Sequence, residues 1–520
     1  MGYNGVKLVV VCVDGGVPGI VTTWNFFSPH RRLPGVVDSL PAPLRSVFPS
    51  STAPGHASFL TATEADGHGI VANRFWEGEP VAQIKRLDPN PFKTLHPYES
   101  HSLQTPSLID WFVQEKQARV SAVHFPHTFS RADAHVTNSS VFCLYAPARS
   151  VRIPLSDLQA ASAPLARDLL YFDEAIPLRI CKSGGSGDRI AISLGATTKP
   201  AVITNGETVQ ISADIAVGRL SLPIRYSTSR SEAELDIGTA VLTLRFGEFG
   251  GSESDPTSLE RSYTANPDVN FSEAPNAWWV CQEVLAALEK NEPDVLFVRF
   301  NQVDHAQEFL YWHATQGDGR TAQLAREQIL DTYQLIDDCL GRIITAVGPD
   351  ADYLLFSDHG IDYVDRRIRP NVVLAQLGLS DRMIFQGDSR VSYLYADEPV
   401  SSAVLDRIVT EIARVEPSAR RVDSRQARNL RVPPASGKQG RTGQLMMMCD
   451  LHHEFVYGET GLASQSVQSA SHGYLPSTPS MYGFTRMFGP NVANMVLPGS
   501  LTEASGVVKA LWDKRSAVRA

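Results

Sequence analysis

Short apolar segments alternate with amphipathic segments along most of the chain, and this alternation limits the fold more than any other feature. The segments that favour buried strands are residues 9–13, 119–124, 294–300 and 353–356. The segments with apolar residues at helical spacing are 107–117, 277–290 and 322–347. Strands that alternate with helices form a mostly parallel sheet covered by helices on both faces. We therefore expect an α/β fold of that kind.

One stretch interrupts the alternation. Between about residues 151 and 250, β-branched residues recur at every second position, which is typical of antiparallel strands. Asn205 and Gly206 stand between two such runs, and an Asn-Gly pair in this place favours a β-hairpin. Residues 250–264 are expected to be the return linker. We predict one α/β domain made of 1–145 and 265–520, with a β-rich insertion at 146–264.

Composition excludes several classes of protein. The net charge is −9 and the basic residues are scattered, so no nucleic-acid-binding surface is expected. The apolar run near the N-terminus is too short for a signal peptide, and no segment is long enough for a membrane span. The 6 cysteines form no Cys-x-x-Cys pair, which favours reduced thiols. We expect a cytoplasmic protein; the sequence leaves its oligomeric state open.

Residues with metal-binding or nucleophilic chemistry follow several of the expected strands. Asp14 ends the first strand, and α/β sheets bind ligands at the carboxyl ends of their strands. Thr52 stands just before a proline at an expected helix N-terminus, where free N–H groups and the helix dipole favour a phosphate. Asp358 and His359 end a later strand, and this pair suits Zn²⁺ or Mn²⁺. Taken singly, each also fits a turn or a helix cap.

Further candidates follow the strand at 294–300. Asp304 and Glu308 are four residues apart, so one helical turn would place both carboxylates on one face. His305 lies between them as another candidate ligand, and His472 stands in a late Ser-His-Gly motif. A solvated loop with ordinary charges explains the first group equally well, and a lone histidine is usually structural.

In their order along the chain, these motifs resemble those of the alkaline phosphatase superfamily. The nearest branch contains the nucleotide pyrophosphatases/phosphodiesterases and phosphonoacetate hydrolase. Thr52-Ala-Pro-Gly-His56 is similar to that branch's Thr-Phe-Pro-Asn-His, and Ser357-Asp-His-Gly360 is nearly identical to its counterpart. Asp66-Gly-His-Gly-Ile-Val-Ala-Asn73 is similar to its Ser-His-Gly-Ile followed by Asn. The resemblance covers about 1–130 and 270–490, and implies an alkaline phosphatase-like, two-metal catalytic domain with 146–264 as a cap or substrate-recognition unit.

The resemblance also implies two sites for divalent metal ions, Zn²⁺ or Mn²⁺. The ligands of one would be Asp14, Asp358, His359 and the oxygen of Thr52; those of the other would be Asp304, His472 and the residue four after Asp304. The family has a histidine at that last position, whereas this chain has Glu308. An Asp/Glu/His site is harder and more negative, so it also suits Fe²⁺ or Mg²⁺. Alternatively, Asn301 and His305 supply the four-residue spacing.

The implied activity is hydrolysis of phosphate esters in the manner of a type I phosphodiesterase/nucleotide pyrophosphatase. Thr52 would attack phosphorus and form a phospho-threonine intermediate, while Asn73 would donate to a phosphoryl oxygen. The substrate would be a small phosphorylated or phosphonate molecule, with no other cofactor, nucleic-acid polymer or membrane involved. The alternatives are a phosphonate C–P hydrolase, a phosphomonoesterase and a non-catalytic binding protein. Residues that could contact substrate are His124, His127, Arg131 and Lys438.

Overall fold

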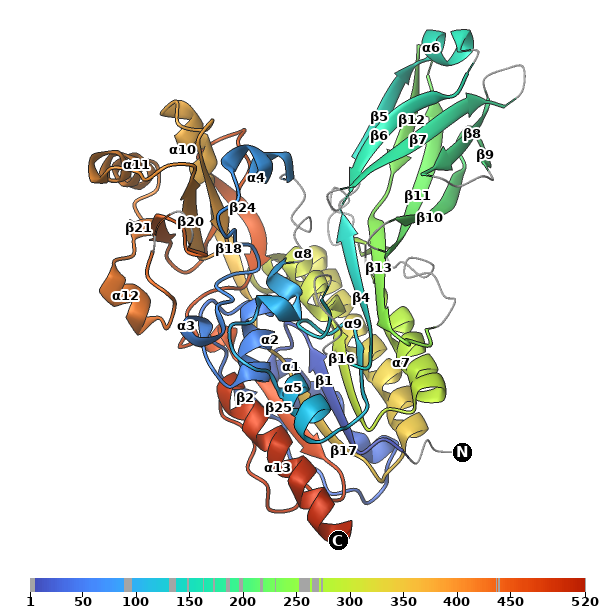
Figure 1. Cartoon of the computed structure of the whole chain (residues 1–520), viewed down its shortest axis with the longest axis vertical. Helices are drawn as coiled ribbons and strands as arrows, with labels where there is room; N and C mark the ends of the chain where they lie inside the picture. The colour runs from blue at the N-terminus through green and yellow to red at the C-terminus, as the bar shows by residue number, and fades with distance from the viewer. Residues whose placement is uncertain are drawn as a thin grey trace.

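The computed structural model consists of an α/β body with a β-rich arm and a smaller α/β module at the same end (Figure 1). The residues described are 5–87, 96–130, 137–146, 149–161, 163–171, 174–183, 188–195, 200–215, 218–229, 231–251, 262–263, 271–272, 275–435, 437 and 440–519.

A 12-stranded sheet forms the centre of the described structure, and its strand order is β2-β25-β17-β1-β16-β3-β4-β13-β11-β12-β5, with β10 beside β11. The strands that run parallel to one another are β17 (Asp352–Phe356), β1 (Leu8–Val13), β16 (Val295–Phe300), β3 (Val120–Val123) and β4 (Ser139–Ala146). The edge strands β25 (Gly483–Phe488) and β2 (Ala42–Leu44) are antiparallel. The expected α/β fold with a mostly parallel central sheet is confirmed.

Helices cover both faces of this sheet because its central strands are apolar on both sides. In β1, Val9 and Val11 belong to one apolar cluster, whereas Val10 belongs to another on the opposite face. The helices of the first face are α7 (Ala277–Asn291), α8 (Gln302–Gln316) and α9 (Gly319–Val347). Those of the second are α2 (Thr52–Thr61) and α13 (Leu501–Arg519).

The helix expected at 107–117 is shorter and less regular than its apolar spacing suggests. A capping box between Ser107 and Asp110 starts α5 (Leu108–Asp110). The chain then widens into a π-helical turn at Trp111–Glu115, in which Lys116 N–H donates to the Trp111 carbonyl at 3.1 Å. Helical periodicity alone cannot distinguish these hydrogen-bond patterns.

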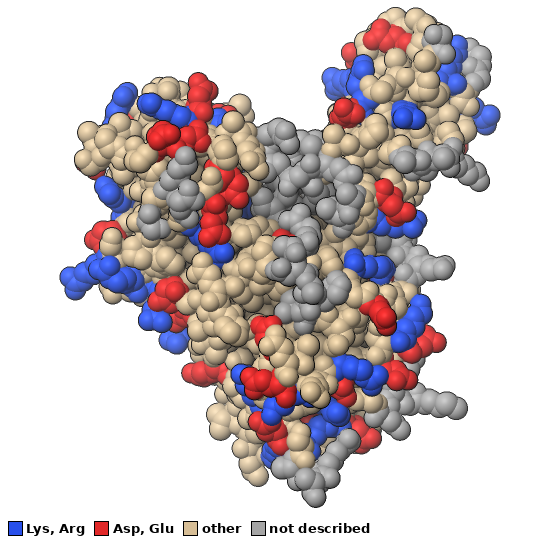
Figure 2. Space-filling model, viewed as in Figure 1, with Lys and Arg blue, Asp and Glu red and all other residues tan. Residues whose placement is uncertain are grey.

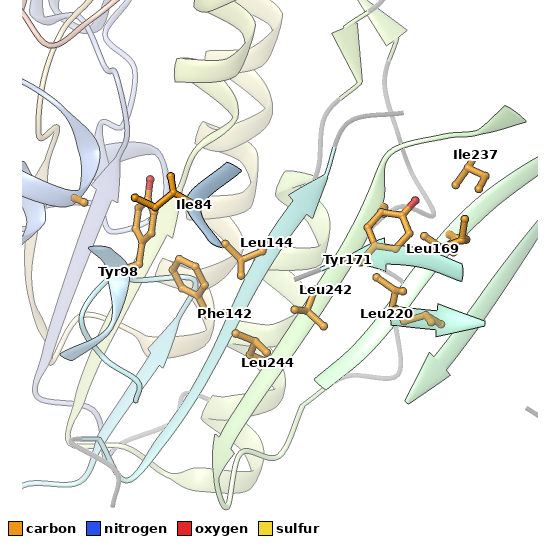
Figure 3. Close-up of a cluster of buried hydrophobic side chains, with 14 of the residues drawn as sticks. Ile84, Tyr98, Phe142, Leu144, Leu169, Tyr171, Leu220, Ile237, Leu242 and Leu244 are labelled. Atoms are coloured by element: carbon orange, nitrogen blue, oxygen red, sulfur yellow. The ribbon is translucent and has the colours of Figure 1, made fainter. Parts of the chain in front are cut away.

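The arm is an antiparallel extension of the central sheet. Its strands in that sheet are β5 (Arg149–Pro154), β10 (Thr208–Ile215), β11 (Gly218–Thr228), β12 (Glu232–Ile237) and β13 (Ala240–Gly247). A second sheet contains β6 (Leu165–Tyr171), β7 (Glu174–Lys182), β8 (Arg189–Leu194) and β9 (Ala201–Thr204). One apolar cluster runs from Tyr98 in the body to Tyr171 in the arm (Figure 3). The domain boundaries 1–145, 146–264 and 265–520 stay a prediction, since only independent folding would define them.

The prediction of a β-hairpin at Asn205 and Gly206 is wrong. The turn forms, with Gly206 at φ +87°, but β9 pairs with β8 while β10 pairs with β11, so the turn joins two sheets. Gly206 N–H donates to the Tyr226 carbonyl at 2.8 Å, and Asn205 accepts from Thr228 N–H at 3.1 Å. These bonds attach the turn to β11 instead of closing β9 on β10.

The module on the other side of the body contains two small sheets. Its strands include β18 (Asp362–Ile368), β23 (His453–Phe455) and β24 (Ser464–Ser471) in one sheet, and β19 (Met383–Gly387), β20 (Val391–Ala396) and β22 (Leu445–Met448) in the other. The helices α10 (Pro370–Gln376) and α11 (Ser402–Val415) pack with the second sheet. No helix within the described residues has the length and apolar character needed to cross a membrane.

Candidate active site

The candidate site lies at the carboxyl edge of the parallel strands, where the connecting loops of an α/β sheet bind ligands. Asp14 follows β1, and Asp358 and His359 follow β17. Asp304 lies in the first turn of α8, directly after β16, and Thr52 is the first residue of α2. The sheet therefore brings together side chains that are hundreds of residues apart in the sequence.

His359 is at the centre of the first cluster. Its Nε2 lies 3.2 Å from Asp14 Oδ1, 3.6 Å from Asp358 Oδ2 and 3.4 Å from Thr52 Oγ1. His359 Nδ1 donates to the Gly360 carbonyl at 2.9 Å, so Nε2 is the ring nitrogen that faces the cluster and could bind a cation. Asp14, Asp358 and His359 each offer a ligand atom within 4.8 Å of the others. The first predicted ligand set is thus assembled.

The second cluster adjoins the first. Asp304, His359 and His472 also offer ligand atoms within 4.8 Å of one another, and the two histidine rings stack with centroids 4.1 Å apart. His472 Nε2 lies 4.0 Å from Asp304 Oδ2 and 3.8 Å from Glu308 Oε1. Glu308 approaches the cluster from α8 with 36% of its side chain exposed. The second predicted set is therefore in one place as well.

The ring of His305, the alternative ligand, contacts Tyr145 and Asn301 and belongs to neither cluster. The Tyr145 hydroxyl and Asn301 Nδ2 lie 2.8 and 3.3 Å from its Nε2, and the Tyr145 ring meets it edge-on. Burial, with a contribution from Arg299, lowers the pKa of His305 to about 4 and keeps the ring neutral. This geometry favours Glu308 over His305 as the residue that completes the second set.

The two clusters fit divalent cations. Asp14 Oδ1, Asp304 Oδ1 and Asp358 Oδ2 are buried and have no hydrogen-bond partner among the described residues. Buried carboxylate oxygens without partners are costly unless a cation lies beside them. Burial, then repulsion from Asp14 and Glu308, raises the pKa of Asp304 well above its usual value. Carboxylate and imidazole ligands of this kind suit Zn²⁺ or Mn²⁺.

Sequence reasoning missed Arg299, which lies near the end of β16. Its Nε and Nη2 donate to Asp14 Oδ2 at 2.7 and 2.5 Å, and its Nη1 lies 3.3 Å from His124 Nε2. Burial disfavours the ionised form of Asp14, but Arg299 and His359 outweigh it and hold the pKa of this carboxyl well below its usual value. The sequence feature that could have indicated its importance is a single arginine in an otherwise apolar strand.

Thr52 and Asn73 meet at the start of α2. Asn73 Oδ1 accepts from Ala53 N–H at 2.8 Å, and Asn73 N–H donates to Asp388 Oδ2 at 3.1 Å. The amide nitrogen of Asn73 is thus the part of the side chain that can donate to a ligand beside Thr52. His56 holds the same turn, because its Nδ1 lies 2.9 Å from the Thr52 carbonyl and 3.3 Å from Asp358 Oδ2.

A cavity of about 460 Å³ is lined by Thr52, Asn73, Asp304, Glu308 and His472, among others. The body, residues 142–145 of β4 and the module all contribute to its walls. Of its arginines, Arg299 pairs with Asp14, and Arg367 pairs with Glu454 at 2.6 Å, whereas Arg74 makes no hydrogen bond or ion pair in the part of the chain that the structure describes.

The four residues predicted as candidate substrate contacts lie in different places. His124 lines the cavity. His127 is buried elsewhere, with its Nε2 3.0 Å from the Ala53 carbonyl. Arg131 and Lys438 lie outside the described residues.

The profile of the family described as type I phosphodiesterase / nucleotide pyrophosphatase matches residues 8–475. No curated protein sequence matches the chain.

Among solved structures, murine ectonucleotide pyrophosphatase/phosphodiesterase 5, in an inactive form in complex with AMP, is 12% identical with a TM-score of 0.51, over 98% of this chain and 95% of that one. The human protein is 13% identical with a TM-score of 0.51, over 98% and 95% of the two chains. A phosphonoacetate hydrolase from Sinorhizobium meliloti is 13% identical with a TM-score of 0.47, over 98% and 96%. The likeness to the first two shows the same fold.

Proposed function

Because this chain belongs to the type I phosphodiesterase/nucleotide pyrophosphatase family of the alkaline phosphatase superfamily, we propose that it is a metal-dependent hydrolase of phosphate esters with Thr52 as its nucleophile. One observation carries the proposal. The Thr52 hydroxyl, at the N-terminus of α2, is 3.4 Å from His359 of the first cluster, and Thr52 lines a cavity together with Asp304, Glu308 and His472 of the second.

The residues that would hold the metal ions are Asp14, Thr52, Asp358 and His359 on one side, and Asp304, Glu308 and His472 on the other. When bound, divalent ions lower the pKa of a coordinated hydroxyl and offset the negative charge that develops on a phosphoryl group. With two carboxylates and one imidazole, the second set suits Zn²⁺ or Mn²⁺, and also Fe²⁺ or Mg²⁺.

The reaction would take place in two steps. Thr52 Oγ forms a bond to phosphorus as the bond to the leaving oxygen breaks. Water then attacks phospho-Thr52, which releases the phosphorylated product and restores the hydroxyl. Asn73, held by Ala53 N–H, donates its amide to a non-bridging oxygen and stabilises the added charge.

We propose a small phosphodiester or pyrophosphate as the substrate class. Among the described residues on the face shown in Figure 2, positive and negative side chains are interspersed and form no basic stripe that would suit a nucleic-acid polymer. The cavity extends from Thr52 to Tyr145 on β4 and Glu454 in the module, so a second group on the phosphate has space. Arg74 is the candidate contact for an anionic part of that group. The murine relative was solved with AMP, a phosphomonoester of the kind that hydrolysis of a nucleotide diester or pyrophosphate would release.

A substrate panel with matched variants tests the proposal. We would assay bis(4-nitrophenyl) phosphate, 4-nitrophenyl phosphate and phosphonoacetate with Zn²⁺ or Mn²⁺ added. Thr52→Ala should lower kcat by at least about a thousandfold while metal content is retained. Thr61→Ala, at the other end of α2, should keep wild-type kcat because its hydroxyl bonds the Ala57 carbonyl and Thr63, away from the two clusters.

Three outcomes would contradict the proposal. More than about a tenth of wild-type kcat in Thr52→Ala would exclude Thr52 as the nucleophile. Binding of metal without turnover of any panel member would favour a non-catalytic protein, whereas turnover of phosphonoacetate or the monoester alone would favour the corresponding alternative hydrolase.

A further inference from the structure

Arg299 changes the number of Asp14 carboxylate oxygens that can bind a metal ion. Both side chains are buried, with Arg299 7% exposed and Asp14 fully covered. Two guanidinium N–H groups bond the same oxygen, Asp14 Oδ2, at 2.7 and 2.5 Å. The other oxygen, Oδ1, has no hydrogen-bond partner among the described residues and lies 3.2 Å from His359 Nε2. Asp14 therefore has one oxygen left for a cation.

The pairing also makes the two clusters unequal in charge. Asp14 and Asp358 bring two negative charges to the Thr52 side, and the guanidinium of Arg299 offsets one of them. When ionised, Asp304 and Glu308 bring two negative charges to the other side, and within the described residues their only ion-pair partner is His472. A histidine binds a metal ion only as the neutral imidazole, so His472 adds no charge to this ligand set.

Nearby groups preserve this difference. Arg74 makes no ion pair with Glu308 among the described residues, and the charge of the nearby Glu454 is offset by Arg367 at 2.6 Å. Attraction between a divalent cation and its ligand set grows with the net negative charge of that set, and more so where water is excluded. The set without an arginine thus attracts a cation more strongly.

We propose that Arg299 limits Asp14 to one-oxygen ligation and makes the Thr52-side site the weaker of the two, so that a divalent ion fills the Asp304/Glu308/His472 site first. This rests on the proposed function, since it requires two metal sites. Arg299 is a positioning residue here, because it acts through Asp14. The site that activates the nucleophile is then the last to be filled, and hydrolysis follows the second equivalent of metal.

The order of filling can be measured without turnover. Mn²⁺ would be titrated calorimetrically into the full chain after removal of metal with a chelator, and crystals grown with one equivalent would be examined by anomalous scattering. We expect two equivalents of unequal affinity, with the first anomalous peak between Asp304 and His472. Arg299→Gln should raise the affinity of the weaker site for Mn²⁺ at least tenfold, because the positive charge that repels the cation is removed.

The sheet provides a matched control. Arg486 on β25 is also buried, 2% exposed, and its Nε donates to Asp38 Oδ1 at 2.9 Å. Arg486→Gln removes a buried arginine–aspartate pair of the same kind away from the site, so both affinities should be unchanged. Glu308→Gln should lower the affinity for the first equivalent of Mn²⁺ instead of the second.

Three results are decisive. A first anomalous peak beside Thr52 in the wild-type protein would overturn the proposal even if no variant folds. An unchanged or weaker second affinity in Arg299→Gln would overturn it as well. Absence of Mn²⁺ binding in the wild-type protein would refute the proposed function itself, whereas two equivalents in the opposite order refute only this inference.

Discussion

Glu308 should make the metal-free protein less stable as pH rises. Burial, then the charge of Glu454, raises its pKa from 4.5 to about 7. Between these two values the folded protein holds a proton that the unfolded chain has released. The contribution of Glu308 to the stability of the folded protein is therefore greatest below about pH 4.5, and it falls as pH rises toward about 7. Asp304, whose pKa is also raised, changes stability in the same direction.

The size of the effect follows from proton linkage. Each proton bound only by the folded state changes the free energy of unfolding by about 1.4 kcal/mol per pH unit. Because 36% of the Glu308 side chain is exposed, solvent screens part of this effect. We expect a loss of about 1–2 kcal/mol between about pH 5 and pH 7 from this residue.

Urea denaturation with a chelator present, at several pH values, measures this loss. Glu308→Gln should flatten the profile over this interval, since the amide does not titrate. With Mn²⁺ present the wild-type slope should reverse, because the cation binds the ionised carboxylates and its apparent affinity rises up to about tenfold per pH unit below pH 7. A flat metal-free profile in the wild-type protein, or an equal slope in Glu308→Gln, would refute the reasoning.

Further predictions concern the walls of the cavity. Asn73→Ala should lower kcat about a hundredfold or more while Mn²⁺ stoichiometry stays at the wild-type value; a change in KM alone would contradict the role in transition-state stabilisation. Arg74→Gln should raise KM for ADP about tenfold or more, and more than for bis(4-nitrophenyl) phosphate, while the exposed Arg382→Gln serves as a control; equal changes would argue against anion recognition. Tyr145→Phe removes the 2.8 Å bond to His305 and should lower unfolding free energy by about 1 kcal/mol in urea titrations.

The residues that could be predicted are those whose local sequence determines their place. Asp14, Asp358 and His359 directly follow apolar strands, and strands of an α/β sheet carry their ligands at that end. Asp304 and Glu308 lie on α8 as the four-residue spacing suggests. Their roles as ligands stay predictions, as does the cytoplasmic location, because neither follows from the fold.

The features that could not be predicted depend on contacts between distant segments. The register of β1 on β16 places Cys12 opposite Arg299, and this pairing brings the guanidinium to Asp14. An isolated arginine in an apolar strand does not reveal its partner. The Asn205–Gly206 turn was misassigned for a similar reason, since the local turn signature does not specify which strands pair on either side of it.

The position of β4 between body and arm has a consequence for protein engineering. β4 pairs in parallel with β3 and, along Ser139–Ala146, antiparallel with β13. Excising residues 146–264 would remove β13 and leave one side of β4 with its backbone N–H and C=O groups unpaired. Exposed strands of this kind recruit other chains, so the truncated protein should self-associate in a concentration-dependent way visible by light scattering. Removing only residues 149–237, which precede β13, keeps the β4–β13 pairing and uncovers only the short part of β13 that pairs with β11, at Val241–Thr243.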